Sequence, residues 1–214
     1  MKVGLGLGLG LLVSGCAPDV DVDYSGPTDD WPQAGGARGG GHYSEVTQIT
    51  KDNVGDLKIA WSHRSGDYHE GGNTIDGVVE GEPFQTSLQV TPVLFDGTLF
   101  YCTPYNRVFA LDPNTGAERW SYDPEVAEEN RGGPCRGVAT WASTQVPVGG
   151  ACQTRILTGT VDGRLIALDA KSGQTCEDFG NDGTVNVLEG LGEHPLGEYK
   201  LTTPGGIIGD VIVI

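Results

Sequence analysis

From about residue 89 onward, short apolar runs alternate with residues that favour tight turns. Asp96-Gly97 is a strong hairpin signal, and the turn from Asp112 to Gly116 combines a proline that presets φ with a glycine that accepts positive φ. The pattern predicts four antiparallel strands near 89–95, 98–103, 107–111 and 117–121, and a further pair near 155–160 and 164–168.

The second group of strands repeats the first. Arg107–Gly116 reads RVFALDPNTG and Arg164–Gly173 reads RLIALDAKSG, so that Asp112 and Asp169 lie 57 residues apart. Thr203–Ile214 repeats the opening hairpin that starts at Thr91. Four-stranded units that recur at this kind of spacing are typical of propeller blades. The sequence therefore predicts an all-β protein with a β-propeller fold, and the alternative is two unrelated hairpins that share turn residues.

The other segments of the chain indicate how many blades it contains. Leu57–His63 alternates in polarity and predicts a strand carrying Trp61, whereas Cys176–Tyr199 is expected to be a long connection. About two and a half blades cannot close a ring of about 4–8 blades. We therefore expect residues 31–214 to be the first two to three blades of a truncated propeller; the alternative is that the apolar run at 207–214 closes a ring.

The N-terminus has the features of an export signal. Lys2 precedes a short apolar run, and Val13-Ser14-Gly15-Cys16 then resembles the cleavage box of bacterial lipoproteins. Residues 1–15 are thus predicted to be a lipoprotein signal peptide, Cys16 the lipidated first residue, and 16–30 an acidic tether. This places the protein on the periplasmic side of a bacterial membrane, with the outer membrane expected. The alternative is a plain secretory signal with a chance cysteine.

Composition narrows the choice of partners. The formal net charge of −16 repels phosphate backbones, so we expect no nucleic-acid partner. No run of 18 apolar residues is present, so no transmembrane helix is expected. The chain also contains 35 glycines, which suits many short strands joined by tight turns.

Besides Cys16, four cysteines remain, and an even number in an exported chain points to disulfides. Cys152 and Cys176 flank one hairpin unit, so we predict that they pair where its strands return. Cys102 and Cys135 are the complementary pair. The histidines are scattered and no CxxC pair exists, so a zinc site is not expected.

Several segments resemble the quinoprotein dehydrogenases that use pyrroloquinoline quinone (PQQ), in particular their membrane-associated sugar and polyol branch. They are the start at Trp31, ITKDNVGDLKIAWSHRSGD (49–67), LQVTP (88–92), CTPYNRVFALDPNTGAERW (102–120), CRGVATW (135–141), GRLIALDAKSG (163–173) and EDFGNDGTVNV (177–187). The resemblance implies an eight-bladed propeller with PQQ and calcium in its central channel, of which this chain is an N-terminal fragment.

PQQ is an ortho-quinone with three carboxylates, so it needs cations and polar donors at fixed positions. By resemblance, Arg107 in TPYNR and Arg136 in CRGV match positions that contact PQQ, and Gln89 in LQVTP matches a position near it. The residues alone also allow simpler roles: an ion pair with a surface acid for Arg107, a bridge between blades for Arg136, and a solvated strand position for Gln89.

The resemblance also implies a reaction. Calcium polarises the quinone while an aspartate takes the proton of an alcohol or sugar substrate, and the electrons pass on to a quinone or cytochrome. The calcium ligands and this aspartate are expected beyond residue 214, so no catalytic or metal residue is assigned here. Gly132 stands where the sugar branch often has a histidine, and the vicinal cysteines of the alcohol branch are absent. The stacking group and the substrate therefore stay open.

A different class of protein shares several of these features. A non-catalytic propeller lipoprotein, similar to the outer-membrane assembly factor built from PQQ-like repeats, would also carry the lipoprotein box, the acidic tether and the ALDxxTG turns. It needs no cofactor arginines. TPYNR (103–107) and CRGV (135–138) therefore favour the dehydrogenase.

Overall fold

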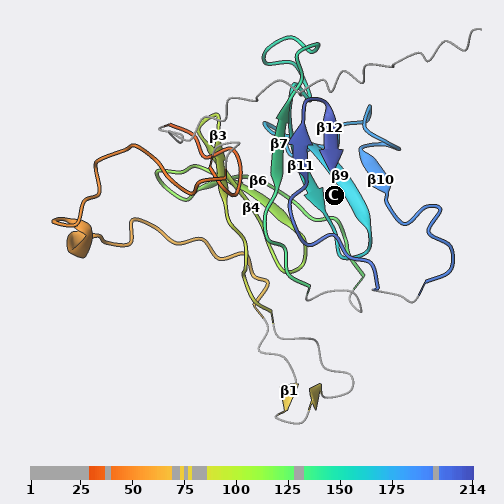
Figure 1. The fold of residues 1–214 in the computed structure, drawn as a ribbon, viewed down its shortest axis with the longest axis horizontal. Coiled ribbons are helices and arrows are strands. Elements are labelled where there is room, and N and C mark those ends of the chain that lie inside the picture. The colour runs from red at the N-terminus through yellow and green to blue at the C-terminus, as the bar shows by residue number, and fades with distance from the viewer. Residues whose placement is uncertain are drawn as a thin grey trace, which may run out of the picture.

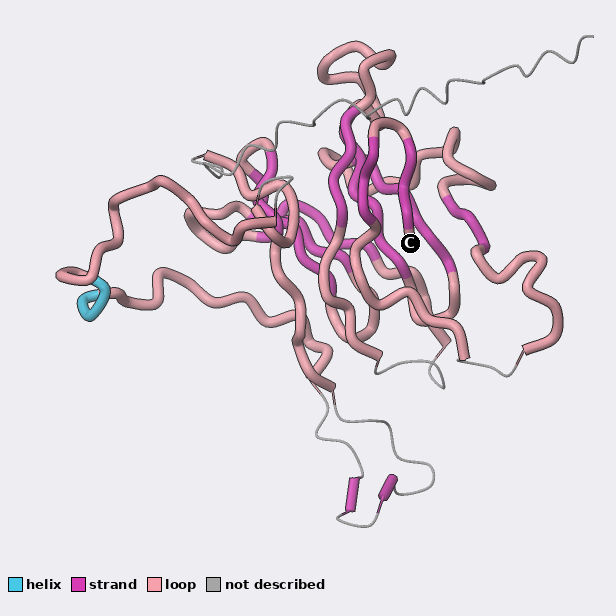
Figure 2. The backbone as a smooth tube through the Cα atoms, in the orientation of Figure 1, coloured by secondary structure: helices cyan, strands magenta, loops and turns pink. Residues whose placement is uncertain are grey.

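A computed structural model describes residues 29–36, 40–68, 73–74, 77–78, 86–127, 133–194 and 198–214. The predicted signal peptide and most of the predicted tether lie outside these ranges. The described part is all-β apart from one 3₁₀ turn, η1 (Val54–Asp56), at the tip of a long loop (Figures 1 and 2). No helix in this part is long and apolar enough to cross a bilayer.

The first blade is a four-stranded antiparallel meander in the order β3-β4-β5-β6. Its strands are β3 (Val93–Phe95), β4 (Thr98–Cys102), β5 (Val108–Leu111) and β6 (Glu118–Tyr122). Asp96 and Gly97 both have positive φ, at 47° and 63°, as a tight hairpin turn requires. The four predicted strands are thus confirmed, although β3 begins at Val93 rather than near residue 89.

The second blade repeats this topology in the order β7-β8-β9-β10. Its strands are β7 (Ala139–Ala142), β8 (Thr154–Gly159), β9 (Arg164–Asp169) and β10 (Thr184–Asn186). The predicted pair corresponds to β8 and β9 and is confirmed. The prediction that Cys176–Tyr199 is only a connection is wrong, because β10 lies within it. This strand has three half-buried or exposed residues and therefore leaves little apolar signal in the sequence.

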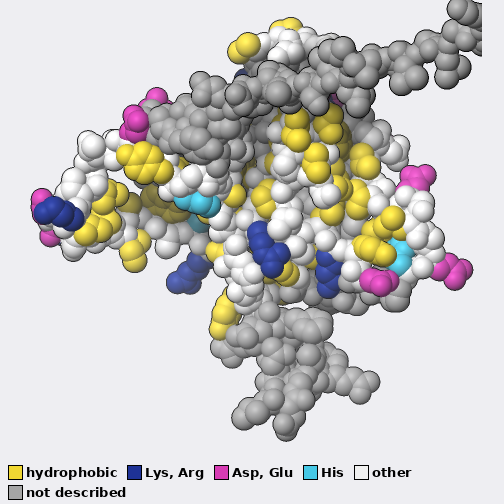
Figure 3. Space-filling model, viewed as in Figure 1, with side chains coloured by type: hydrophobic (Ala, Val, Ile, Leu, Met, Phe, Trp, Pro, Cys, Tyr) yellow, Lys and Arg dark blue, Asp and Glu magenta, His cyan; other side chains and the backbone are white. Residues whose placement is uncertain are grey.

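Two further hairpins complete the described strands. β11 (Gly206–Ile208) pairs with β12 (Val211–Val213), as the repeat of the opening hairpin predicts, and β11 packs beside β7 (Figure 1). A small hairpin pairs β1 (Asn73–Thr74) with β2 (Gly77–Val78). Figure 3 shows apolar side chains gathered over the β11–β12 hairpin, where Ile208, Val211 and Val213 are exposed.

The main core lies between the two blades. Alternate residues of β4 and β5 face β8 and β9, and the buried cluster contains Val93, Phe100, Cys102, Val108, Ala110, Trp120, Cys135, Val138, Ile156, Ile166 and Leu168. Trp120 closes its outer edge by packing on the β9 turn of the second blade. Its Nε1 donates to Ala170 O at 3.0 Å, and a Cβ at Gly173 would lie 2.6 Å from its ring. The first blade thus docks a tryptophan of its outer strand onto a turn of the second.

Residues 57–67 repeat the same contact one blade earlier. Trp61 Nε1 donates to Pro113 O at 3.0 Å, and its ring covers Gly116. The segment therefore packs on the first blade in the same way as β6 packs on the second blade. The predicted strand at Leu57–His63 is wrong as a sheet element, because among the described residues it has no hydrogen-bonded strand partner. Its alternation is explained only in part, since Trp61 and His63 face the blade whereas Leu57 and Ile59 are exposed.

Both predicted disulfides are confirmed. Cys152–Cys176 has a Cα–Cα distance of 5.7 Å and lies inside the second blade. Cys102–Cys135 has a Cα–Cα distance of 5.9 Å and joins the two blades.

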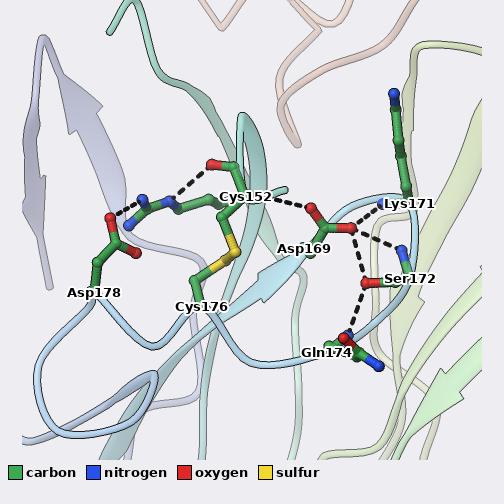
Figure 4. Close-up of a disulfide and its surroundings, with 8 residues drawn as sticks. Cys152, Asp169, Lys171, Ser172, Gln174, Cys176 and Asp178 are labelled. Carbon is green, nitrogen blue, oxygen red and sulfur yellow. Dashed lines mark hydrogen bonds and ion pairs between the residues drawn. A yellow bond between two sulfur atoms is a disulfide. The ribbon is translucent and has the colours of Figure 1, made fainter. Parts of the chain in front are cut away.

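Beside the Cys152–Cys176 disulfide, Asp169 accepts hydrogen bonds from the N–H of Cys152 on one side and from the N–H groups of Lys171 and Ser172 of its own turn on the other (Figure 4). Burial acts to raise the pKa of Asp169, but these hydrogen bonds outweigh it and lower the pKa.

Candidate cofactor-binding site

The segments that lead into three consecutive blades meet at Arg136. Thr91 N, just before β3, donates to Arg136 O at 3.0 Å, and Arg136 N donates to Thr202 O, ahead of β11, at 2.9 Å. Gly137 permits this approach, because a Cβ there would lie 3.3 Å from Pro204 Cγ and 3.4 Å from Thr91 O. Backbone from all three blades is therefore concentrated around one arginine.

The Arg136 side chain is exposed at this junction. Its Nη1 donates to Thr202 Oγ1 at 2.8 Å, and no other described residue accepts a hydrogen bond from the guanidinium. The predicted simple role, a bridge between blades, is therefore real. The bond to Thr202 uses one of five N–H donors, so the planar fork retains donors for a carboxylate.

Gln89 reaches the same junction through the backbone. It lies two residues before Thr91, whose N–H binds Arg136, and its side chain is exposed ahead of the first residue of β3. The structure thus brings the segments of Gln89 and Arg136 together. Both side chains are exposed, and both have polar groups that no described residue hydrogen-bonds.

Arg107 lies elsewhere. It precedes β5, an interior strand of the first blade, rather than an edge strand as an innermost position requires. Its guanidinium forms an ion pair with the buried carboxylate of Asp67, donates to Ser65 O and stacks over Phe109 at 5.4 Å. A cofactor carboxylate would therefore compete with Asp67 for the guanidinium of Arg107. Asp67 was not singled out from the sequence, because the segment at 65–81 is polar and glycine-rich.

The second blade contains a twin of Arg107. Arg164 closes the same five-residue turn, and it bonds an acid, Asp162, and a backbone carbonyl, Pro124 O at 2.8 Å. Pro124 follows Trp120 by four residues, just as Ser65 follows Trp61. Both arginines therefore fasten a turn to the segment that leaves the preceding outer strand. The repeat of TPYNR as TVDGR (160–164) was the signal in the sequence for this structural role.

The pKa shifts at the second clamp follow from its ion pair. Burial acts to raise the pKa of Asp162, but hydrogen bonds from Arg164 and Thr160 outweigh it and lower the pKa. The hydrogen bond to Asp162 raises the pKa of Arg164, although burial opposes this. Both groups stay charged at neutral pH, so this arginine is committed to its internal partner.

A further polar cluster holds residues 57–67 to the first blade. His63 Nδ1 lies 2.6 Å from Tyr101 Oη, and His63 Nε2 lies 3.6 Å from Glu118 Oε2. Burial, together with the negative charge of Glu118, raises the pKa of Tyr101 to about 12. The phenol therefore stays neutral and can donate to the imidazole.

The residues at the blade starts fit an anionic cofactor. An exposed guanidinium with unused N–H donors is well suited to bind a carboxylate. The missing Cβ of Gly137 lets the segments at Thr91 and Pro204 lie close to the backbone beside Arg136. Cys16 and Gly132 lie outside the described residues. Within the described ranges, no group of three or more His, Cys, Asp or Glu residues is placed to hold a metal ion.

Comparison with known proteins identifies the family of this fold. The family model described as "Glucose/ethanol/alcohol dehydrogenase, beta-propeller domain", the PQQ family, matches residues 31–214. The glycerol dehydrogenase large subunit of Gluconobacter oxydans is 36% identical over 86% of this chain and 24% of its own length. The quinoprotein glucose dehydrogenase of Escherichia coli is 37% identical over 86% of the chain and 23% of its own length.

A solved structure shows the same fold. The quinohemoprotein alcohol dehydrogenase from Comamonas testosteroni matches 91% of this chain and 25% of its own chain, with a TM-score of 0.62 and 26% identity. The chain thus spans about a quarter of the length of these relatives. From its sequence, its paired blades and these matches, the chain belongs to the family of PQQ-dependent quinoprotein dehydrogenases.

Proposed function

We propose that this chain is part of a PQQ-dependent dehydrogenase that oxidises a sugar, a polyol or another alcohol. The observation that carries the proposal is the exposed guanidinium of Arg136, held where three blade starts meet. The named activities of the relatives support the substrate class, since they are glycerol, glucose and quinate or shikimate dehydrogenases. Because the chain covers about a quarter of those proteins, the activity belongs to the whole protein.

Within this chain, the proposed task is to hold the cofactor. Bound PQQ would supply the quinone that accepts hydride from the substrate. The Arg136 fork would grip one of its carboxylates, and the Gln89 amide, on the neighbouring segment, would donate a further hydrogen bond. The backbone bonds to Thr91 and Thr202 hold the main chain of Arg136, and the bond from Nη1 to Thr202 Oγ1 limits its rotamers, which lowers the entropy lost on binding.

The remaining parts of the proposal concern the whole protein. We place the calcium ligands and the aspartate base outside residues 1–214, and we propose a quinone or cytochrome as electron acceptor. The lipoprotein box supports an anchor at Cys16 and a location on the periplasmic side of a bacterial membrane.

Arg136→Ala in the full-length protein tests the cofactor site. Truncating one partner of a charged, hydrogen-bonded pair costs about 2–5 kcal/mol, so the PQQ dissociation constant should rise by about 30-fold or more. Equilibrium dialysis of PQQ against the apoprotein measures this change. Arg136→Lys keeps the charge without the planar fork and should give an intermediate constant.

Two variants serve as controls for Arg136→Ala. Arg64→Ala removes an exposed arginine that faces away from the first blade and should leave PQQ affinity unchanged. Thr202→Val removes the bridging hydroxyl and keeps the guanidinium, so most of the affinity should remain. A protein that binds no PQQ in any form would instead be the cofactor-free scaffold propeller, and equal affinity in Arg136→Ala would remove Arg136 from the site.

A further inference from the structure

The disulfide between the blades ends next to the arginine of the proposed site. Cys102, the last residue of β4 in the first blade, is fully buried, and Cys135, which directly precedes Arg136, is 3% exposed. The bond therefore ties Arg136 to a strand of the neighbouring blade through a single residue.

The backbone around Arg136 needs such a tie. Residues 133–138 precede β7 and belong to no strand, so sheet hydrogen bonds do not hold them. Arg136 has only its two backbone bonds, to Thr91 and Thr202, one to each flanking blade. Both partners also lie outside strands. The chain itself joins this segment to β7 of its own blade, and the disulfide adds the covalent cross-link to β4, a buried strand of the neighbouring blade.

The other disulfide lies in a different setting. Cys152–Cys176 joins the start of β8 to the turn after β9, and both ends belong to the second blade. The two bonds close loops of similar length, with sequence separations of 33 and 24, so their effects on the unfolded chain are similar. Only Cys102–Cys135 is adjacent to a residue of the proposed site.

We propose that the Cys102–Cys135 disulfide is a positioning device for Arg136, which fixes its guanidinium for an anionic cofactor. This inference rests on the proposed PQQ function. Its consequence is that loss of this buried disulfide weakens cofactor binding, while loss of the other disulfide affects stability alone.

The test compares two paired substitutions in the full-length protein. Cys102→Ala/Cys135→Ala should raise the PQQ dissociation constant by about tenfold or more, because a misplaced guanidinium loses much of its bidentate contact. Cys152→Ala/Cys176→Ala should leave the constant within about twofold. Both pairs should lower the thermal unfolding midpoint by similar amounts, since the loops are similar in length. Equilibrium dialysis and calorimetry separate the two effects.

A double-mutant cycle identifies the residue through which the disulfide acts. If Arg136 carries the effect, adding Cys102→Ala/Cys135→Ala to Arg136→Ala should change the PQQ dissociation constant by no more than about twofold. Independent, multiplying effects would show that the disulfide acts elsewhere. Gly137→Ala tests separately whether the placement of Arg136 sets PQQ affinity, because its Cβ would lie 3.3 Å from Pro204 Cγ while the disulfide stays intact. It should also weaken PQQ binding.

The outcomes distinguish this inference from the proposed function. Wild-type protein that fails to bind PQQ overturns the proposed function. Wild-type protein that binds PQQ, together with unchanged affinity in Cys102→Ala/Cys135→Ala, overturns only the positioning role. If that variant does not fold, unchanged affinity in Cys152→Ala/Cys176→Ala protein after reduction of its remaining disulfide overturns it instead.

Discussion

At the scale of single residues, the two candidate arginines differ in what already binds them. Asp67, which pairs with Arg107, has a side chain only 2% exposed and also accepts the N–H of Tyr105 at 3.2 Å. Arg136 binds only a threonine hydroxyl with its side chain. A guanidinium paired with a buried carboxylate has less to gain from a second anion, so the structure favours Arg136 as the cofactor ligand and Arg107 as a clamp.

Arg107→Ala and Asp67→Ala test this assignment. Arg107→Ala leaves a buried carboxylate unpaired and should cost about 3 kcal/mol of unfolding free energy. Asp67→Ala should cost less, because the guanidinium that remains is partly exposed to water. Urea unfolding of the full-length protein measures both changes, and PQQ affinity should stay within about twofold in both variants.

The cofactor role that the resemblance implies for Arg107 makes a different prediction. In that case Arg107→Ala weakens PQQ binding strongly, whereas Asp67→Ala, which releases the guanidinium, leaves it intact. The pair of variants therefore decides between the two roles without reference to stability.

At the scale of elements, each blade depends on a tryptophan seated on a glycine of its neighbour. Gly173 has φ of 72°, and Gly116, which receives Trp61, has φ of 71°. A side chain at either position would meet both an unfavourable backbone conformation and an indole ring. The glycines of the ALDPNTG and ALDAKSG turns are therefore docking surfaces as well as turn residues.

Gly173→Ala measures this docking, with Gly97→Ala as its matched control. Gly97 also has positive φ, at 63°, but a Cβ there meets nothing within 4 Å, so its substitution should cost only the backbone strain of about 1–2 kcal/mol. Gly173→Ala adds a contact of 2.6 Å with Trp120 and should cost about 1–3 kcal/mol more. Equal losses in chemical denaturation would show that the indole moves aside freely.

At the scale of the whole molecule, the blades form a series of similar contacts. The extended segment at 57–67, the two four-stranded blades and the β11–β12 hairpin follow one another, and each packs on the next. The proposed cofactor site lies where the starts of three members of this series meet. The site thus depends on the relative placement of blades rather than on one local motif.

The proposed lipid anchor is also a property of the whole protein. Cys16→Ser in the full-length protein, expressed in a bacterial host, should abolish lipidation and shift the protein from the membrane fraction to the soluble fraction. Fractionation with mass spectrometry of the N-terminal peptide measures this. Membrane partitioning that persists in Cys16→Ser would argue against the anchor.

The sequence by itself determined the strands, the turns and the repeat. The turns form between residues that are neighbours in the chain, so local preferences are enough to predict them. They are Asp96-Gly97, Asp162-Gly163 and the ALDPNTG and ALDAKSG turns. The disulfide pairing followed as well, because Cys152 and Cys176 flank one hairpin unit and leave Cys102 and Cys135 as the complementary pair. The strand β10 escaped prediction because three half-exposed residues carry little pattern.

Only the tertiary structure decided what the arginines do. Arg107 meets Asp67 across 40 residues of sequence, and Arg136 meets Thr202 across 66, so neither contact is visible in a local pattern. Both arginines precede strands and both follow bends, which made them equivalent in the sequence. Packing of the blades buries Asp67, the partner of Arg107, and leaves the side chain of Arg136 exposed. The reason is that Arg107 lies beside an interior strand, whereas Arg136 lies where the blade starts meet.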